Sequence, residues 1–580
     1  MKRTNHPFMK KAIPSLLLLL VSHLSFSQGN WTGNTSPTYP ELIEHLKKLD
    51  KAHKELSMYE MGPSDYGLPI YLFVINGEKD SIRTFQKAKT GTTILINNAI
   101  HPGEPDGINA CLIWLDQWIA QGKPLATKDG KKLPVIAFIP AYNVGGMMNR
   151  SSTSRANQNG PEEYGFRGNA RNFDLNRDFI KMDSKNAFTF ARIFHALDPD
   201  VFIDNHVSNG ADYQYTLTYI ASMKERMSPQ MTELTYGKCI PFLEKNVKQQ
   251  GWDLFPYVEL KGETPAQGIH AFNDLPRYAM GYASLFHSIS FTVETHMLKP
   301  FPQRVQATLA FMEGIIAFTK EHAIEIETKR MEAKKWAQNL AHYAYNYQLS
   351  DHADSIVFKG YEHSFPVHPI TGLKELTYDR SKPYERNIPW FRTYVATDSV
   401  RVPEYYVVGG QEQHVIDRLK ANQVVFQTVT SEQLDTLRIF AVKSYKSPGN
   451  PYEGHFKLSK IEVGESQQVV QLKPGDILIP SQQDAALFIH ASLQSCAEDS
   501  YLSWNFFDSY LQQKEYFSNY VFKDQIADIL AKDKALKDEY QLRKATDEKF
   551  RNSEWDQLYF IYSHSPYFEQ TFMRLPVYQK

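Results

Sequence analysis

Cysteine is scarce in this sequence of 580 residues, which contains only Cys111, Cys239 and Cys496. So few cysteines exclude a disulfide scaffold, and at most one pair could form a bridge. Cys111 falls on the apolar side of an expected helix, where a cysteine usually acts as a small apolar side chain. We therefore expect Cys111 to lie in a protein core.

An excess of charge of one sign is also missing. The 64 Lys and Arg residues and 65 Asp and Glu residues give a formal net charge of −1, which excludes a chain built as a whole to bind nucleic acid. The 42% of hydrophobic and 22% of charged residues match a globular protein and exclude a disordered one. Aromatic residues, at 13%, are the one unusual component of the composition.

Long apolar runs are missing after residue 27. The first 27 residues have a basic start, an apolar stretch at 12–24, and the small residues Ser25 and Ser27 before Gln28. This pattern is typical of a cleaved secretory signal, and the apolar stretch is shorter than the roughly 18 residues of a spanning helix. We therefore expect residues 1–27 to be a signal peptide. The mature chain would be soluble, without a membrane span, and exported to the periplasm or the extracellular space.

Short apolar runs alternate with helical patterns between residues 39 and 300. The runs expected to form strands are 69–75, 92–100, 134–141, 201–205 and 288–293, and helices are expected at 40–53 and 108–119. Runs that are apolar on both faces predict an α/β fold, with a mostly parallel or mixed twisted sheet and helices on both faces. In such sheets ligands bind at the carboxyl ends of the strands.

The second half has a different pattern. A helical stretch at 302–348 is followed by short runs rich in Val, Tyr and Phe up to residue 480, and then by helical periodicity. We therefore expect an α/β domain at 28–345, a β-rich accessory domain at 346–480 and a helical segment at 481–580. The aromatic clusters of this half are expected to be core, with a carbohydrate-binding or docking face as the alternative.

His101 and Glu104 lie three residues apart on the turn after the expected strand 92–100. An imidazole and a carboxylate at this spacing can bind one cation, and catalytic zinc needs three such ligands and an open position. The spacing alone is weak, because about one chance occurrence is expected in a chain with this many histidines. His322 and Glu325 have the same spacing in a charged helix, where we expect a solvated face.

Other segment ends carry matching residues. His206 and Glu294 each end an apolar run, and Asp174, Asn176 and Arg177 form a compact polar block. Four separate strand or loop ends thus offer groups of the same chemistry, which chance does not explain. These groups are therefore expected to form one site at the edge of the sheet.

These blocks, over residues 38–300, resemble the zinc carboxypeptidases of the carboxypeptidase A-like metallopeptidase family. The residues that carry the resemblance are His101 and Glu104, the distant His206, Arg167 seven residues before Asp174, the pair Asn176 and Arg177, and Glu294 in the sequence FTVETH. The resemblance implies that residues 28–345 are a catalytic domain. It also implies that one Zn²⁺ is bound by His101, Glu104 and His206.

The resemblance implies a role for each remaining residue. Glu294 would be the general base toward a zinc-activated water and then the acid toward the leaving amine. Arg167 would stabilise the tetrahedral oxyanion. Asn176 and Arg177 would bind the terminal carboxylate of the substrate, and Asp174 would fix the tautomer of His101.

Several assignments stay open at this stage. Arg171 could take the place of Arg167, and Asp204 either orients His206 or is a charge at a strand end. Arg277 either faces the side-chain pocket or lies on the surface. The candidates for a mobile tyrosine are Tyr278 and Tyr282, with Phe272 at the ungapped spacing.

The sequence therefore predicts an exported zinc metallocarboxypeptidase that hydrolyses the C-terminal bond of peptides with a free carboxylate. The alternatives are action on cell-wall (peptidoglycan) peptides or another amide, or a non-catalytic protein that binds peptides or glycans. A nucleic-acid partner is not expected, and the oligomeric state stays open.

Overall fold

The computed structural model describes residues 31–126 and 130–580, so the signal peptide expected at 1–27 lies outside the described residues. Helix α1 (Tyr39–Ala52) begins after Thr38, whose side chain accepts a hydrogen bond from the N–H of Glu41. The Glu41 carboxylate accepts the N–H of Thr38 in return, which completes a capping box. The helix expected at 40–53 is confirmed.

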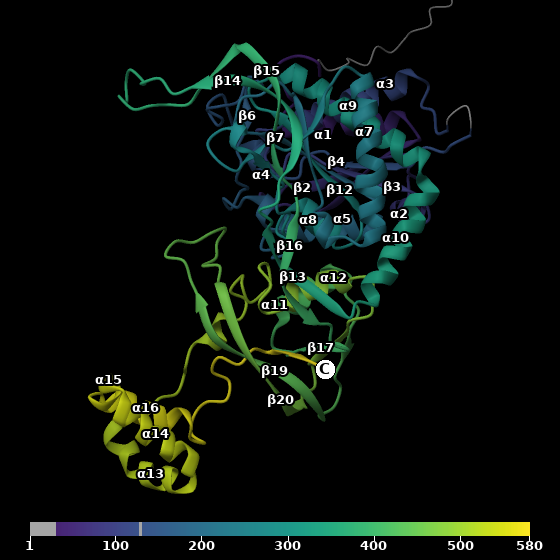
Figure 1. Ribbon diagram of the computed structural model, residues 1–580. Helices are drawn as coiled ribbons and strands as arrows, with labels where there is room; N and C mark the ends of the chain where they lie inside the picture. The colour runs from purple at the N-terminus through teal and green to yellow at the C-terminus, as the bar shows by residue number, and fades with distance from the viewer. Residues whose placement is uncertain (1–30, 127–129) are drawn as a thin grey trace, which may run out of the picture.

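An eight-stranded sheet forms the centre of the first half (Figure 1). Its strand order is β1 (Leu56–Pro63), β2 (Pro69–Ile75), β4 (Val135–Ile139), β3 (Thr93–Asn97), β7 (Val201–Ser208), β12 (Ile289–His296), β8 (Leu217–Ala221) and β9 (Leu254–Pro256). The pairs β4–β3, β3–β7, β7–β12 and β8–β9 are parallel, whereas β1–β2, β2–β4 and β12–β8 are antiparallel. All five strands expected from apolar runs are confirmed, in a mixed sheet.

Helices cover both faces of this sheet. The main ones are α2 (Ser81–Lys89), α3 (Asp106–Ala120), α5 (Lys185–Leu197), α7 (Ile240–Gln249), α8 (Ala279–Ser284) and α9 (Phe301–Glu321). Phe202 of β7 contacts Phe190 of α5, and Phe291 of β12 contacts Phe311 of α9. Phe291 is paired with the residue that follows Phe202, so the two rings point to opposite faces. The predicted α/β class is confirmed.

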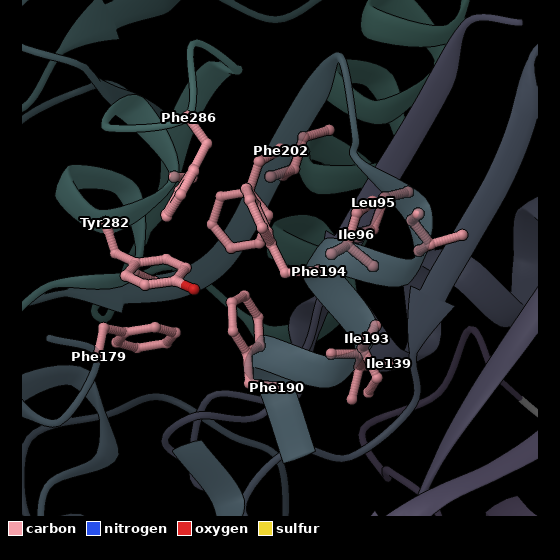
Figure 2. Packing of buried hydrophobic residues seen from close by; sticks show 14 of the residues in the cluster. Leu95, Ile96, Ile139, Phe179, Phe190, Ile193, Phe194, Phe202, Tyr282 and Phe286 are labelled. Carbon is pink, nitrogen blue, oxygen red and sulfur yellow. The ribbon is translucent and has the colours of Figure 1, made fainter. Parts of the chain in front are cut away.

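A cluster of aromatic side chains lies in the core between the sheet and α5. Figure 2 shows Phe190, Phe194, Phe202, Tyr282 and Phe286 packed together. The ring centroids of Phe194 and Tyr282 are 5.4 Å apart, and those of Tyr282 and Phe286 are 5.3 Å apart. Phe488 of α12 (Ala486–Leu493) stacks on Phe286 at 5.8 Å, so this core continues into the second half of the chain.

Cys111 of α3 is buried in the core, as expected, and contacts Met312 of α9. All three cysteines belong to the described residues, and all three are free. In the described part of the chain, no helix is both long and apolar enough to cross a membrane.

The second half begins with α10 (Ala323–Gln338) and continues mainly as β structure. Strand β13 (His342–Leu349) pairs with β16 (Tyr394–Arg401). Strands β14 (Asp354–Ser364) and β15 (Thr377–Phe391) form a four-stranded sheet with two short strands of the first half, β10 (Glu259–Leu260) and β11 (Ile269–His270), in the order β10, β11, β15 and β14. A six-stranded sheet has the order β18 (Gln427–Thr428), β21 (Ile477–Pro480), β17 (Tyr405–Val408), β22 (Val577–Gln579), β19 (Gln433–Lys446) and β20 (Ser459–Leu472). The β-rich character of this region is confirmed. The region also contains a helix that the sequence pattern did not predict, α11 (Gln413–Ala421).

A helical bundle follows and stands apart at the lower left of Figure 1. It consists of α13 (Asn519–Lys532), α14 (Lys534–Thr546), α15 (Glu548–Arg551) and α16 (Glu554–Ser563). Phe522, Leu536 and Phe550 are buried in its own small core. The chain then returns to the six-stranded sheet, where β22 pairs with β17. The helical character expected near the C-terminus is confirmed, and the last strand is an exception to it.

A buried ion pair joins α9 to the start of α3. Arg304 and Asp106 are 0% and 1% exposed, and the Arg304 Nε donates to Asp106 Oδ1 at 2.9 Å. The guanidinium also donates to the carbonyls of Asn159, Gly160 and Lys299, so its remaining N–H groups are satisfied. This pair therefore fixes the segment that directly follows Glu104.

Replacing Arg304 by Ala should destabilise the protein strongly. The change leaves the Asp106 carboxylate buried without its cation, which we expect to lower the free energy of unfolding by about 3–5 kcal/mol. Guanidinium denaturation followed by tryptophan fluorescence measures the change. Lys48→Ala removes an exposed ion pair with Glu44 and serves as the control, with an expected change of about 0.5 kcal/mol or less. Equal effects of the two substitutions would contradict the role of the buried pair.

Candidate functional site

The predicted metal ligands come together at the carboxyl ends of β3 and β7. His101 and Glu104 lie in the connection from β3 to α3, where the N–H of Glu104 donates to the His101 carbonyl at 2.8 Å. His206 lies within β7, and all three side chains are buried. A Cβ at Gly103 would lie 2.9 Å from the Gly165 carbonyl oxygen, so this tight turn needs glycine. The fold thus brings the HxxE pair and the distant histidine to one place.

Their ligand atoms form a small triangle. His206 Nδ1 lies 3.0 Å from Glu104 Oε2 and 3.2 Å from His101 Nδ1, and His101 Nδ1 lies 3.3 Å from Glu104 Oε2. Ligands of a tetrahedral zinc, each about 2.1 Å from the ion, are roughly 3.4 Å apart. The residues therefore fit one small divalent cation. Within the described ranges, no other group of three or more His, Cys, Asp or Glu residues is arranged to hold a metal.

The second ring nitrogen of each histidine faces a carboxylate. His101 Nε2 lies 3.0 Å from Asp174 Oδ1, and His206 Nε2 lies 2.7 Å from Asp204 Oδ2. Such bonds fix the tautomer and leave Nδ1 free to bind a metal. Asp204 is fully buried beside His206. It therefore orients this histidine and is not an exposed charge at a strand end.

Asp174 is ionised in this environment. Burial by itself raises the pKa of Asp174, but its contact with His101, and then the guanidinium groups of Arg167 and Arg177, outweigh burial and hold the pKa well below its ordinary value. Arg167 contributes to this effect, since its Nε donates to Asp174 Oδ2 at 3.0 Å. The Asp174 carboxylate therefore contacts both His101, a predicted metal ligand, and Arg167, the arginine expected at the oxyanion.

Glu294 lies on β12 directly opposite His206 of β7. Side chains of paired residues point to the same face of a sheet, so both face the same pocket. Burial raises the pKa of Glu294 to about 8, an effect that Glu104 and Asp204 strengthen and His206 opposes. Glu294 Oε2 is buried and has no hydrogen-bond partner among the described residues, so it is free to accept a proton or hydrogen bond from a bound molecule.

The pocket has a volume of about 360 Å³. Besides the ligands and Glu294, its polar lining includes Arg167, Asn176 and Arg177. The Arg177 guanidinium lies over the ring of Tyr278 at 4.6 Å, and Asn176 Oδ1 accepts the N–H of Ala279 at 3.0 Å. Both side chains are thus fixed from one side, and their remaining donors are available to an anion in the pocket.

The open assignments of the two arginines are decided by their contacts. Arg171 donates to the carbonyl of Asp183 and is not among the described residues that line the pocket, whereas Arg167 is. Arg277 occupies neither of the places expected for it. It is buried, and its Nη2 lies 2.7 Å from Asp499, a residue of the second half that the sequence pattern did not connect with it.

The candidates for a mobile tyrosine divide in a similar way. Tyr278 and Phe272 line the pocket and contact each other at 5.0 Å. Tyr282 is buried in the aromatic core of Figure 2. Tyr257, which no motif marks, also lines the pocket. The tyrosines available to a substrate are therefore Tyr278 and Tyr257.

Arg155 is a further pocket residue that no sequence motif marks. Its Nη2 lies 2.7 Å from Glu104 Oε1. Burial disfavours the Glu104 carboxylate, but His101 and then Arg155 outweigh this effect and hold the pKa of Glu104 well below its usual range. Glu104 is therefore ionised, as a metal ligand must be. An isolated arginine in a Ser- and Asn-rich loop has no spacing that could have identified it.

Asp204→Asn should weaken metal binding without removing a ligand. The amide cannot stabilise the donated ring N–H of His206 as a carboxylate does, so we expect the zinc dissociation constant to rise about 10- to 100-fold. Competition with a chromogenic chelator measures this constant. Asp351→Asn changes a fully exposed aspartate and should leave it unchanged. An unaltered zinc affinity in Asp204→Asn would refute the assigned contact.

No protein-family model matches the chain. Among solved structures, a metallo-carboxypeptidase from Burkholderia cenocepacia is 18% identical, with a TM-score of 0.36, over 48% of this chain and 69% of that chain. Carboxypeptidase A from Helicoverpa armigera is 15% identical, with a TM-score of 0.37, over 52% of this chain and 75% of that chain.

A curated relative matches much more of the chain. Carboxypeptidase 2 of Trichophyton rubrum is 20% identical over 506 residues, which cover 82% of this chain and 86% of the relative. The match extends well beyond the residues on which the motifs lie. It confirms the resemblance of this chain to the carboxypeptidase A-like family of zinc metallopeptidases.

Proposed function

We propose that the chain is an exported zinc metallocarboxypeptidase that hydrolyses the C-terminal bond of peptides. The observation that carries this proposal is the pairing of Glu294 with His206 beside a buried His–Glu–His set. The name of the Trichophyton rubrum relative, Carboxypeptidase 2, supports the same class of reaction. The signal-like pattern of residues 1–27 supports export to the periplasm or the extracellular space.

A zinc ion held by His101, Glu104 and His206 would supply a Lewis acid that activates water and polarises the scissile carbonyl. Glu294 accepts the proton of the attacking water and transfers it to the leaving amine. Burial raises the pKa of Glu294 and a bound cation would lower it again, which suits this double role, because a group that first accepts and then donates a proton works best near the operating pH.

The arginine side of the pocket determines which bond is cleaved. Arg177 and Asn176 bind the terminal carboxylate of the peptide, the guanidinium through two parallel N–H groups. Arg167 lies between Asp174 and Glu104, with its Nη1 3.7 Å from the Glu104 carboxylate, and stabilises the oxyanion. Because a carboxylate is required at this position, the enzyme acts only at the end of a chain.

Glu294→Gln should abolish turnover but retain the metal. We expect kcat to fall about 10²- to 10⁴-fold, because the amide cannot accept the proton of water. Release of C-terminal residues from a peptide library and zinc content by atomic absorption are measured on the same preparations. The control is Glu332→Gln, which changes a partly exposed residue of α10. Zinc-loaded wild type without chelator-sensitive hydrolysis would refute the peptidase, and an active Glu294→Gln would refute the base.

Arg177→Ala should remove the preference for a free carboxylate. For a peptide with a free C-terminus we expect kcat/KM to fall about 10- to 100-fold, which corresponds to the free energy of one charge-assisted hydrogen bond. The same peptide with an amidated C-terminus should be a poor substrate of the wild type and should change little in the variant. Arg171→Ala, six residues earlier in the sequence and outside the pocket lining, is the matched control. Equal loss for both peptides would contradict carboxylate recognition by Arg177.

A further inference from the structure

The second half of the chain touches the polar block from behind the pocket. Residues 447–458 connect β19 to β20, and Glu453 Oε2 in this connection accepts the backbone N–H of Asp174 at 2.8 Å. Two residues later, His455 Nε2 lies 2.6 Å from Asp183 Oδ2. The connection therefore binds both ends of the segment 174–183, which carries Asn176 and Arg177.

The backbone of this connection is shaped for the contact. Glu453 and Gly454 have φ values of 49° and 82°, and the left-handed region is unfavourable for a residue with a side chain such as Glu453. A Cβ at Gly454 would lie 2.9 Å from the ring of Phe173, the residue before Asp174. The close approach of this backbone to the Phe173 ring thus needs glycine at position 454.

A second acid of the same half binds the neighbouring segment 277–279. Asp499 Oδ2 accepts the backbone N–H of Arg277 at 2.9 Å and its Nε at 3.2 Å. Arg277 precedes Tyr278, the ring on which Arg177 lies. Asp499 is buried, so this pair is shielded from solvent and fixes the backbone that carries Tyr278.

The contacts of Glu453 and Asp499 are made to two segments that are hydrogen-bonded to each other. Asn176 accepts the N–H of Ala279 through its side chain, and its own N–H donates to Asp174 Oδ1 at 2.9 Å. Segment 174–177 and segment 277–279 therefore form one unit. Glu453 of the second half binds the first segment, and Asp499, with Glu498 at the Arg277 guanidinium, binds the second. Neither Glu453 nor Asp499 is among the described residues that line the pocket.

We propose that Glu453 and Asp499 are positioning residues, through which the second half of the chain holds Asn176, Arg177 and Tyr278 in place for a carboxylate. This inference rests on the proposed function, because it concerns the same pocket. The predicted metal ligands and Glu294 are attached to strands of the central sheet or to its edge, and Glu453 contacts the backbone of Asp174, whereas the Asp174 carboxylate faces His101. Loss of the contact should therefore weaken carboxylate binding, seen as a higher KM, and alter kcat and zinc content little.

The test compares three variants of the full chain: Glu453→Ala, Glu453→Gln and Glu465→Ala. Glutamine keeps an oxygen that can accept the N–H of Asp174, whereas alanine does not. Glu465 is an exposed residue of β20 and serves as the control. Binding of an N-acetylated dipeptide, as free acid and as amide, is measured by calorimetry in the zinc-loaded Glu294→Gln background. KM and kcat are measured with Glu294 intact.

We expect Glu453→Ala to raise the dissociation constant and KM of the free acid about tenfold, with weak binding of the amide unchanged. Glu453→Gln should bind like the parent, and so should Glu465→Ala. Unchanged binding in Glu453→Ala, or a fall in kcat and zinc content in place of the binding loss, would overturn the inference. Asp499→Asn, which weakens the second contact, should raise KM in the same way and provides an independent variant if Glu453→Ala folds poorly.

The failure of the two proposals can be told apart. A zinc-loaded wild type that hydrolyses no peptide refutes the peptidase. The calorimetric comparison of acid and amide uses a variant that needs no turnover, so it still tests whether Glu453 controls the carboxylate-binding wall.

Discussion

The parallel pairing of β7 with β12 is the constraint on which the rest of the site depends. The register places His206 opposite Glu294, and it holds over the full length of both strands. Because paired side chains point to the same face, an imidazole and a carboxylate become neighbours without a loop that must fold around them. A slip of one residue would turn Glu294 to the other face, against α9, and the site would not form.

Burial makes the charges of the site depend on one another. His206 is matched by Asp204 and His101 by Asp174, and a buried charge without such a partner would be strongly destabilising. Glu294 differs, since its Oε2 lacks a hydrogen-bond partner among the described residues. An otherwise satisfied network thus leaves one acceptor open, on the residue that we propose as the general base.

The second half of the chain is part of the same body as the α/β half. Phe488 of α12 stacks on Phe286, and the hydroxyl of Tyr282 donates to Asn422 just after α11 at 2.6 Å. The contacts of Glu453 and Asp499 extend this shared surface to the wall of the pocket. The helical bundle α13–α16, with its own core, is the part that stands apart in Figure 1.

The sequence by itself determined the central strands and the set of chemical groups at their ends. Runs that are apolar on both faces form buried strands, and a polar residue at the end of such a run marks the edge where ligands collect. Only the tertiary structure decided the partners of these groups: Asp204 for His206, Arg155 for Glu104, Asp499 for Arg277 and Glu453 for Asp174. The reason is physical. Periodicity records which face of an element is buried, whereas an ion pair or hydrogen bond between distant segments depends on where separate loops meet, and it leaves no repeat or spacing in the sequence.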